Sequence, residues 1–129
     1  MTRRAIIPAG LDAAAAQTGM TPAIAANGFL FLTGATGSGP NGVMPADPEA
    51  QIRQAFSKIS QVLVAADLTF DAVVEMTSYH IGLRAHFDLF DRIRREVFAA
   101  PYPAWTAVEA AGLRRERAIV EIRIIASHS

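Results

Sequence analysis

The most informative segment of this 129-residue chain is Pro101-Tyr102-Pro103-Ala104-Trp105-Thr106-Ala107-Val108-Glu109. Its two prolines fix the backbone where the chain leaves a charged helical segment, and they bias the preceding residues toward extended geometry. The residues that follow have the composition of a strand, and a second strand is expected over 118–126. The first of these strands carries the only tryptophan, Trp105, and the second carries Glu121.

Trp105 and Glu121 together form the best candidate site in the sequence. A tryptophan beside a proline-fixed bend, with a carboxylate on a neighbouring strand, is typical of a small-molecule cleft. The residue types favour a second interpretation about equally, a core tryptophan and an edge-strand glutamate, because tryptophan is usually well buried.

The composition indicates one domain over residues 1–129, with residues 1–20 as an Ala-rich N-terminal arm. Twelve basic and twelve acidic residues balance, so no global field favours nucleic acid or an anionic membrane as a partner. The lack of cysteine excludes a disulfide scaffold and a thiolate metal site. No apolar run is long enough to span a bilayer, and we therefore expect a cytoplasmic protein. The hydrophobic content of 51% favours burial of part of the surface against other copies of the chain.

The first half of the chain predicts a hairpin, a connection and a helix. Asn27-Gly28 lies between two apolar runs, which is the strongest short signal for a β-hairpin. The Gly-rich segment 33–42 lacks the lysine of a phosphate-binding loop, and we expect a flexible connection there. Asp47-Pro48-Glu49 then predicts the start of an amphipathic helix that ends near Asp67.

The second half predicts a strand over 72–81, a helix with an apolar stripe from Phe87 to Val97, and a terminal hairpin. The predicted order is therefore β-β-α-β-α-β-β, an α+β fold with one sheet covered on one face. Tyr79 and Ile81 alternate onto the uncovered face, so another surface must cover it.

The common catalytic and metal-binding patterns are missing from the sequence. His80, His86 and His128 lack the spacing of a metal site, and no serine lies in a nucleophile-elbow context. We therefore expect no metal and no cofactor. The Arg114-Arg115-Glu116-Arg117 turn mixes basic with acidic residues, and a solvated loop is the simplest interpretation of it.

Several motifs, taken together, resemble the Rid/YjgF family of reactive intermediate deaminases. They are Gly28 with Thr33-Gly34, Ala50-Gln51-x-Arg53-Gln54-Ala55, the Tyr102–Glu109 segment and Val120–Ala126, and the resemblance spans about Asn27 to Ala126. It implies a chorismate-mutase-like α+β fold with two helices on one face of a mixed sheet. It also implies a homotrimer with a ligand cleft at each subunit interface.

Active members of that family hydrolyse enamines and imines such as 2-aminoacrylate, and they hold the substrate carboxylate with an arginine at the position of Trp105. An indole donates only one neutral hydrogen bond and cannot replace a bidentate guanidinium. The resemblance implies that Glu121 orients the attacking water and that Thr33 and Gly34 lend backbone amides. The family's cleft tyrosine has no match near Thr18–Thr21.

The remaining expected cleft residues are Arg84, Tyr79 and Ala107. Arg84 is a candidate for the missing positive charge, although an ordinary surface arginine is the more common case. Trp105 either forms a wall against which a ligand stacks, with Glu121 across from it, or fills the cleft as a plug.

Two function classes follow from the resemblance and the departure at Trp105. The first is a deaminase or binding protein for a bulky or aromatic enamine, imine, keto acid or other carboxylate. The second is a non-catalytic member that binds metabolites or protein partners.

Overall fold

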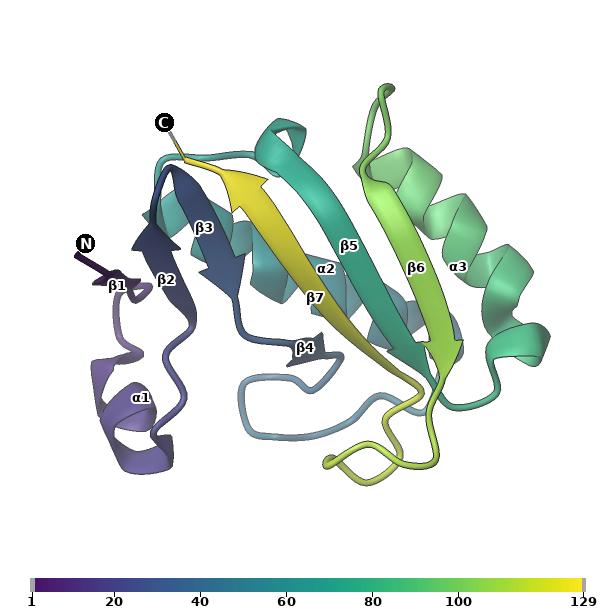
Figure 1. Ribbon diagram of the computed structural model, residues 1–129. Coiled ribbons are helices and arrows are strands. Elements are labelled where there is room, and N and C mark those ends of the chain that lie inside the picture. The colour runs from purple at the N-terminus through teal and green to yellow at the C-terminus, as the bar shows by residue number, and fades with distance from the viewer. Residues whose placement is uncertain (1, 129) are drawn as a thin grey trace.

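The computed structural model describes residues 2–128, and Figure 1 shows a curved sheet with two long helices packed behind it. Among these residues seven strands form one sheet, in the order β1-β2-β3-β7-β5-β6, with the short β4 also pairing with β7. The elements are β1 Arg4–Ile6, α1 Asp12–Thr18, β2 Ala23–Ala26, β3 Phe29–Leu32, β4 Ala35–Thr36, α2 Pro48–Ala65, a 3-10 turn Phe70–Ala72, β5 Val73–His80, α3 Leu83–Val97, β6 Ala104–Glu109 and β7 Val120–Ser127. Within residues 2–128, none of the helices is long and apolar enough to cross a membrane.

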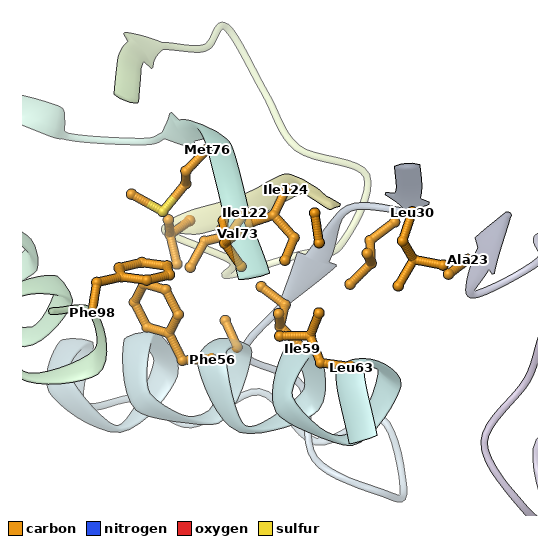
Figure 2. Close-up of a cluster of buried hydrophobic side chains, with 14 of the residues drawn as sticks. Ala23, Leu30, Phe56, Ile59, Leu63, Val73, Met76, Phe98, Ile122 and Ile124 are labelled. Atoms are coloured by element: carbon orange, nitrogen blue, oxygen red, sulfur yellow. The ribbon is translucent and has the colours of Figure 1, made fainter. Parts of the chain in front are cut away.

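The core lies between the sheet and the two long helices, as predicted. Phe56, Ile59 and Leu63 of α2 point toward Ile122 and Ile124 of β7 (Figure 2), and these five side chains are almost fully buried. Alternate residues of β7 are buried against the helices, while Glu121, Arg123 and Ile125 face the other side of the sheet. We call that other side the open face.

Local signals gave the hairpin and the long helix correctly. Asn27 and Gly28 both have positive φ, at 54° and 78°, and they join β2 to β3 in an antiparallel pair. Asp47 caps α2, because its carboxylate accepts a hydrogen bond of 3.0 Å from the Ala50 amide. The helix ends just before Asp67, which has a φ of 59°, in the left-handed region.

The predicted terminal hairpin is wrong. β6 pairs with β5 in parallel, and β7 lies on the other side of β5, between β5 and β3. Since α3 connects β5 to β6, the three elements form a β-α-β crossover, which brings the second strand back parallel to the first. Gln51 fixes the long return loop, because its side chain donates to the Arg117 carbonyl and accepts from the Ile119 amide, both at 2.9 Å.

Two other expectations need correction. Residues 33–42 are not a flexible connection throughout, since β4 pairs with β7 and Thr36, Gly37 and Ser38 are buried. A β-bulge between Val73 and Glu75 leaves Val74 exposed, although simple alternation places it on the buried face. The N-terminal arm contributes a strand, β1, to the sheet and the short helix α1.

Candidate functional site

A cavity of about 590 Å³ lies between α1, the segment that follows β3, and α2. Thr33, Gly34 and Glu121, which come from distant parts of the sequence, all line this cavity. Leu32, Ile59 and Val62 supply part of its apolar wall. Its volume lies within the range of about 300–1,000 Å³ that is usual for small-molecule sites.

Glu121 reaches the cavity from β7, where its neighbours across the sheet are Thr36 of β4 and Tyr79 of β5. The side chain packs so closely on Gly34 that a Cβ atom added there would overlap its carboxylate. None of the ion pairs formed within residues 2–128 includes Glu121. Glu121 is therefore half-buried against a glycine, with a carboxylate that no arginine or lysine neutralises directly.

A second, smaller hollow of about 380 Å³ adjoins the first on the open face of the sheet. Gly34, Arg114 and Glu121 line both hollows, and Tyr79 and Arg123 line only the second. Tyr79 thus lies beside Glu121 on the neighbouring strand.

Thr33 is held by its own chain. Its amide donates a 2.9 Å hydrogen bond to the Pro22 carbonyl, and its hydroxyl donates to the Thr21 carbonyl. The Thr33 amide is therefore not available to a ligand. Of the two expected backbone donors, only the Gly34 amide remains.

Lys58 is the cavity residue that sequence reasoning missed. It lies on α2, and its ammonium group donates to the carbonyl and the hydroxyl oxygen of Ser38, at 3.2 and 3.0 Å. Burial lowers the pKa of Lys58, the nearby Arg115 lowers it further, and Glu121 acts in the opposite sense. The helical pattern placed Lys58 on the polar side of α2. The one hint of its partial burial in the sequence is that Lys58 directly precedes Ile59, a core residue of the same helix.

Arg114 and Arg115 also line the cavity, although the turn that contains them was expected to be a solvated loop. Both side chains are exposed overall, as that expectation requires, and yet the turn passes the mouth of the cavity. The cavity wall therefore carries three basic residues and one acidic residue.

Trp105 lies on the opposite face of the sheet from Glu121. Its ring packs on one stripe of α3, with the Phe87 and Phe90 centroids at 5.6 and 5.5 Å and the Arg94 guanidinium 4.3 Å from the indole centroid. The expected arrangement, in which Glu121 stands across from Trp105, is therefore not formed within one chain. The reason is that residue 105 pairs with Met76, whose side chain is buried on the helix side.

A buried hydrogen-bond chain holds the indole in place. The Trp105 ring N–H donates to the Ser78 hydroxyl, which lies 2.8 Å from Nε2 of His80. Burial lowers the pKa of His80 to about 4, so the imidazole that is hydrogen-bonded to Ser78 is neutral at pH 7. Trp105 thus uses its only polar atom inside its own subunit.

The other two expected site residues lie away from the cavity. Arg84 is exposed on the first turn of α3, and Ala107 shares the helix side of β6 with Trp105. Close to Arg84, the Glu109 carboxylate accepts from the Gly82 and Leu83 amides at 2.9 and 2.6 Å. These bonds lower the pKa of Glu109 and cap the start of α3.

Comparison with known proteins identifies the family. Residues 10–128 match the family described as Endoribonuclease L-PSP. The chain is 36% identical over 107 residues to RutC family protein YjgH of Escherichia coli K12, with 82% of each chain covered. It is 34% identical over 122 residues to a protein of Lactococcus lactis subsp. lactis named putative regulator AldR, with 93% of this chain and 95% of the relative covered.

Solved structures give the same result. That of protein YJGH has a TM-score of 0.88 at 34% identity, covering 98% of this chain and 97% of the other. The Rid-family protein YyfA of Yersinia pestis has a TM-score of 0.83 at 27% identity, covering 98% and 99%. The mixed sheet with its helices is thus the fold of that family, and the chain belongs to the Rid/YjgF family, also described as Endoribonuclease L-PSP.

Proposed function

We propose that this protein hydrolyses a 2-imino acid or enamine that is bulkier than 2-aminoacrylate, with Glu121 as the acid–base group. The observation that carries the proposal is the cavity of about 590 Å³ that collects Thr33, Gly34 and Glu121. Its apolar wall suits an aliphatic or aromatic side chain. Position 105 carries a tryptophan instead of the arginine that binds the carboxylate of 2-aminoacrylate in active family members. This substitution argues against 2-aminoacrylate as the substrate.

The reaction requires one water molecule and one group that accepts and then returns a proton. Glu121 removes a proton from water as the oxygen attacks the C=N carbon, which gives a tetrahedral carbinolamine. The same carboxyl group returns the proton to nitrogen. Glu121 next moves the proton of the carbinolamine hydroxyl to the nitrogen as the C–N bond breaks, so that ammonia leaves and the oxygen remains as the carbonyl of a 2-oxo acid. An enamine enters the same sequence after protonation at carbon has converted it to the imine.

The proposal includes a homotrimer that covers the open face of the sheet. Phe29 and Phe31 of β3 are 43% and 38% exposed on that face, which is more aromatic surface than a strand normally shows to water. A trimer would also bring the β6 edge of one subunit toward the cavity of another, which is where the exposed Arg84 would gain a role. Light scattering at micromolar concentration should give three times the chain mass, and a monomer mass would contradict the trimer.

The test uses imino acids produced in situ by an amino-acid oxidase, with the rate of 2-oxo acid release as the readout. We expect acceleration with the imine of phenylalanine, and little with 2-aminoacrylate supplied by a serine dehydratase. Glu121→Gln should lower the rate by about 100- to 10,000-fold, the usual contribution of a general base. An unchanged rate in Glu121→Gln would overturn the assignment of Glu121.

A non-catalytic role is the second candidate, and Trp105 is the observation that favours it, because the family's substrate-binding arginine is absent. One relative, putative regulator AldR of Lactococcus lactis subsp. lactis, is named as a regulator and not as an enzyme. In this case 2-oxo acids would raise the melting temperature, since a ligand that binds only the folded form stabilises it, but no imine would be hydrolysed faster.

A further inference from the structure

Lys58 is the only lysine of the chain, and its setting differs from that of the exposed arginines. It is half-buried on α2, in the wall of the large cavity, and Ser38 accepts two of its hydrogen bonds. Ser38 is itself buried, with 5% of its surface exposed, and the Thr36 hydroxyl donates to it at 3.4 Å. The ammonium group is therefore fixed in position by the folded segment that follows β3.

The charge of Lys58 has no direct counter-ion among residues 2–128. None of the ion pairs formed there includes Lys58. An ammonium group has three N–H donors, and Ser38 takes two of them, so one remains for another acceptor. Arg114 and Arg115 line the same cavity, where Glu121 is the only acidic residue. A half-buried cation in such a setting favours an anion from outside the chain.

We propose that Lys58 binds the carboxylate of the ligand in the Glu121 cavity and so supplies the positive charge that position 105 lacks. This inference rests on the proposed function, because it assumes that a 2-imino acid or 2-oxo acid occupies that cavity. The carboxylate carbon of such an acid is bonded directly to the carbon that water attacks. A carboxylate held at Lys58 therefore keeps the reacting carbon inside the cavity that Glu121 also lines.

Two features of the site support this role. Lysine binds a carboxylate as a point charge without the fork geometry of arginine, which suits a cavity that one flexible side chain enters from a helix. Burial and the nearby Arg115 lower the pKa of Lys58, and a bound carboxylate would counteract both. Binding should accordingly weaken as the pH rises through the lowered pKa of Lys58.

The first experiment is calorimetric titration with phenylpyruvate and with phenylacetone, which has the same skeleton without the carboxylate. Lys58→Met should weaken phenylpyruvate binding by about ten- to a hundredfold, the usual contribution of a charged hydrogen bond, and should leave phenylacetone binding unchanged. Lys58→Arg, which keeps the charge, should stay within a few fold of the wild type. Arg53→Met removes an exposed charge from the same helix and serves as the matched control.

The second experiment needs no variant. Because Lys58 is the one lysine, an amine-acylating reagent can modify only this side chain and the N-terminal amine, and peptide mass spectrometry separates the two. Phenylpyruvate should protect Lys58 from acylation, and phenylacetone should protect it much less. Equal protection by both compounds, or equal phenylpyruvate affinity in Lys58→Met and the wild type, would overturn the inference.

Failure of the inference is distinguishable from failure of the proposed function. If wild-type protein binds phenylpyruvate and the affinity does not depend on Lys58, the Glu121 cavity stands and Lys58 is not its anion-binding group. If wild-type protein binds none of phenylpyruvate, 2-oxobutanoate and pyruvate, the proposed function fails and the inference fails with it.

Discussion

Trp105 and Glu121 lie on the two faces of one sheet, and their surroundings differ in every respect that matters for function. Trp105 packs against Phe87, Phe90 and Arg94, and its ring N–H is hydrogen-bonded to Ser78. Glu121 faces two adjoining hollows and takes part in no ion pair among residues 2–128. The polar atom of Trp105 is hydrogen-bonded within its own chain. The Glu121 carboxylate lines a cavity without an ion-pair partner among residues 2–128.

One motif position can therefore make structural contacts while other motif residues line a cavity. In this chain, the position that carries arginine in active relatives has the contacts of a structural residue. The glutamate, the glycine beside it and the cavity are still present. We therefore propose that the Trp105 side of the sheet serves stability and that the Glu121 side serves the chemistry.

The largest effect on stability is expected for Trp105→Ala. Removing a large aromatic side chain that α3 covers should lower the free energy of unfolding by about 3 kcal/mol, because the contacts with α3 and the Ser78 hydrogen bond are lost. Denaturant unfolding at a fixed protein concentration measures this loss. Phenylpyruvate affinity at pH 7 should not change. A variant as stable as the wild type but unable to bind phenylpyruvate would place Trp105 in the ligand site instead.

Acid should destabilise the Trp105 side through His80. Its pKa is about 4 in the folded protein and 6.5 in the ordinary case, so the unfolded chain takes up the proton first as the pH falls. The stability that neutral His80 contributes is complete above pH 6.5, declines between pH 6.5 and 4, and is absent below that. The total is on the order of 3 kcal/mol.

The measurement for His80 is denaturant unfolding from pH 7 to pH 4 in the wild type and in His80→Gln. Glu109, Arg84 and His86 lie near this region, and the variant retains all three, so the difference between the two pH profiles isolates His80. Parallel profiles would show that His80 is not buried in its neutral form.

A smaller effect, on the Glu121 side, is expected for Gly34→Ala. A Cβ atom at Gly34 would overlap the Glu121 carboxylate, so the carboxylate must move, and the hydrolysis rate should fall roughly tenfold, equivalent to about 1.4 kcal/mol of activation free energy. Gly39 lines the same cavity, and Gly39→Ala is the matched control because its Cβ would make only an ordinary 3.6 Å contact with the Val43 carbonyl. Equal rates in the two variants would mean that the position of Glu121 does not matter.

Features that depend on neighbouring residues could be predicted from the sequence. Asn27-Gly28 specifies its turn through the two positive φ angles, and Asp47 specifies a helix start through its own carboxylate. The family motifs placed Glu121, Thr33 and Gly34 in one site, and the structure brings these three together at the cavity.

Features that depend on distant pairing could not be predicted. The direction of the Trp105 side chain is set by the parallel register of β6 on β5, which no local pattern encodes. The Val74 bulge reverses an alternation that is otherwise regular. Lys58 reaches the cavity only because residues 36–38 fold onto α2, where a Cβ at Gly37 would overlap the Gln51 backbone.

A crystal structure of the protein with phenylpyruvate bound tests most directly whether Lys58 and Glu121 form the ligand site. We expect the ligand in the cavity lined by Gly34, Lys58 and Glu121, with its carboxylate at the Lys58 ammonium group and its carbonyl carbon facing Glu121. The contacts of Trp105 with Phe87, Phe90 and Ser78 should remain as they are. A ligand stacked on the Trp105 ring, with no contact to Lys58 or Glu121, would contradict the assignment of the ligand site to these two residues.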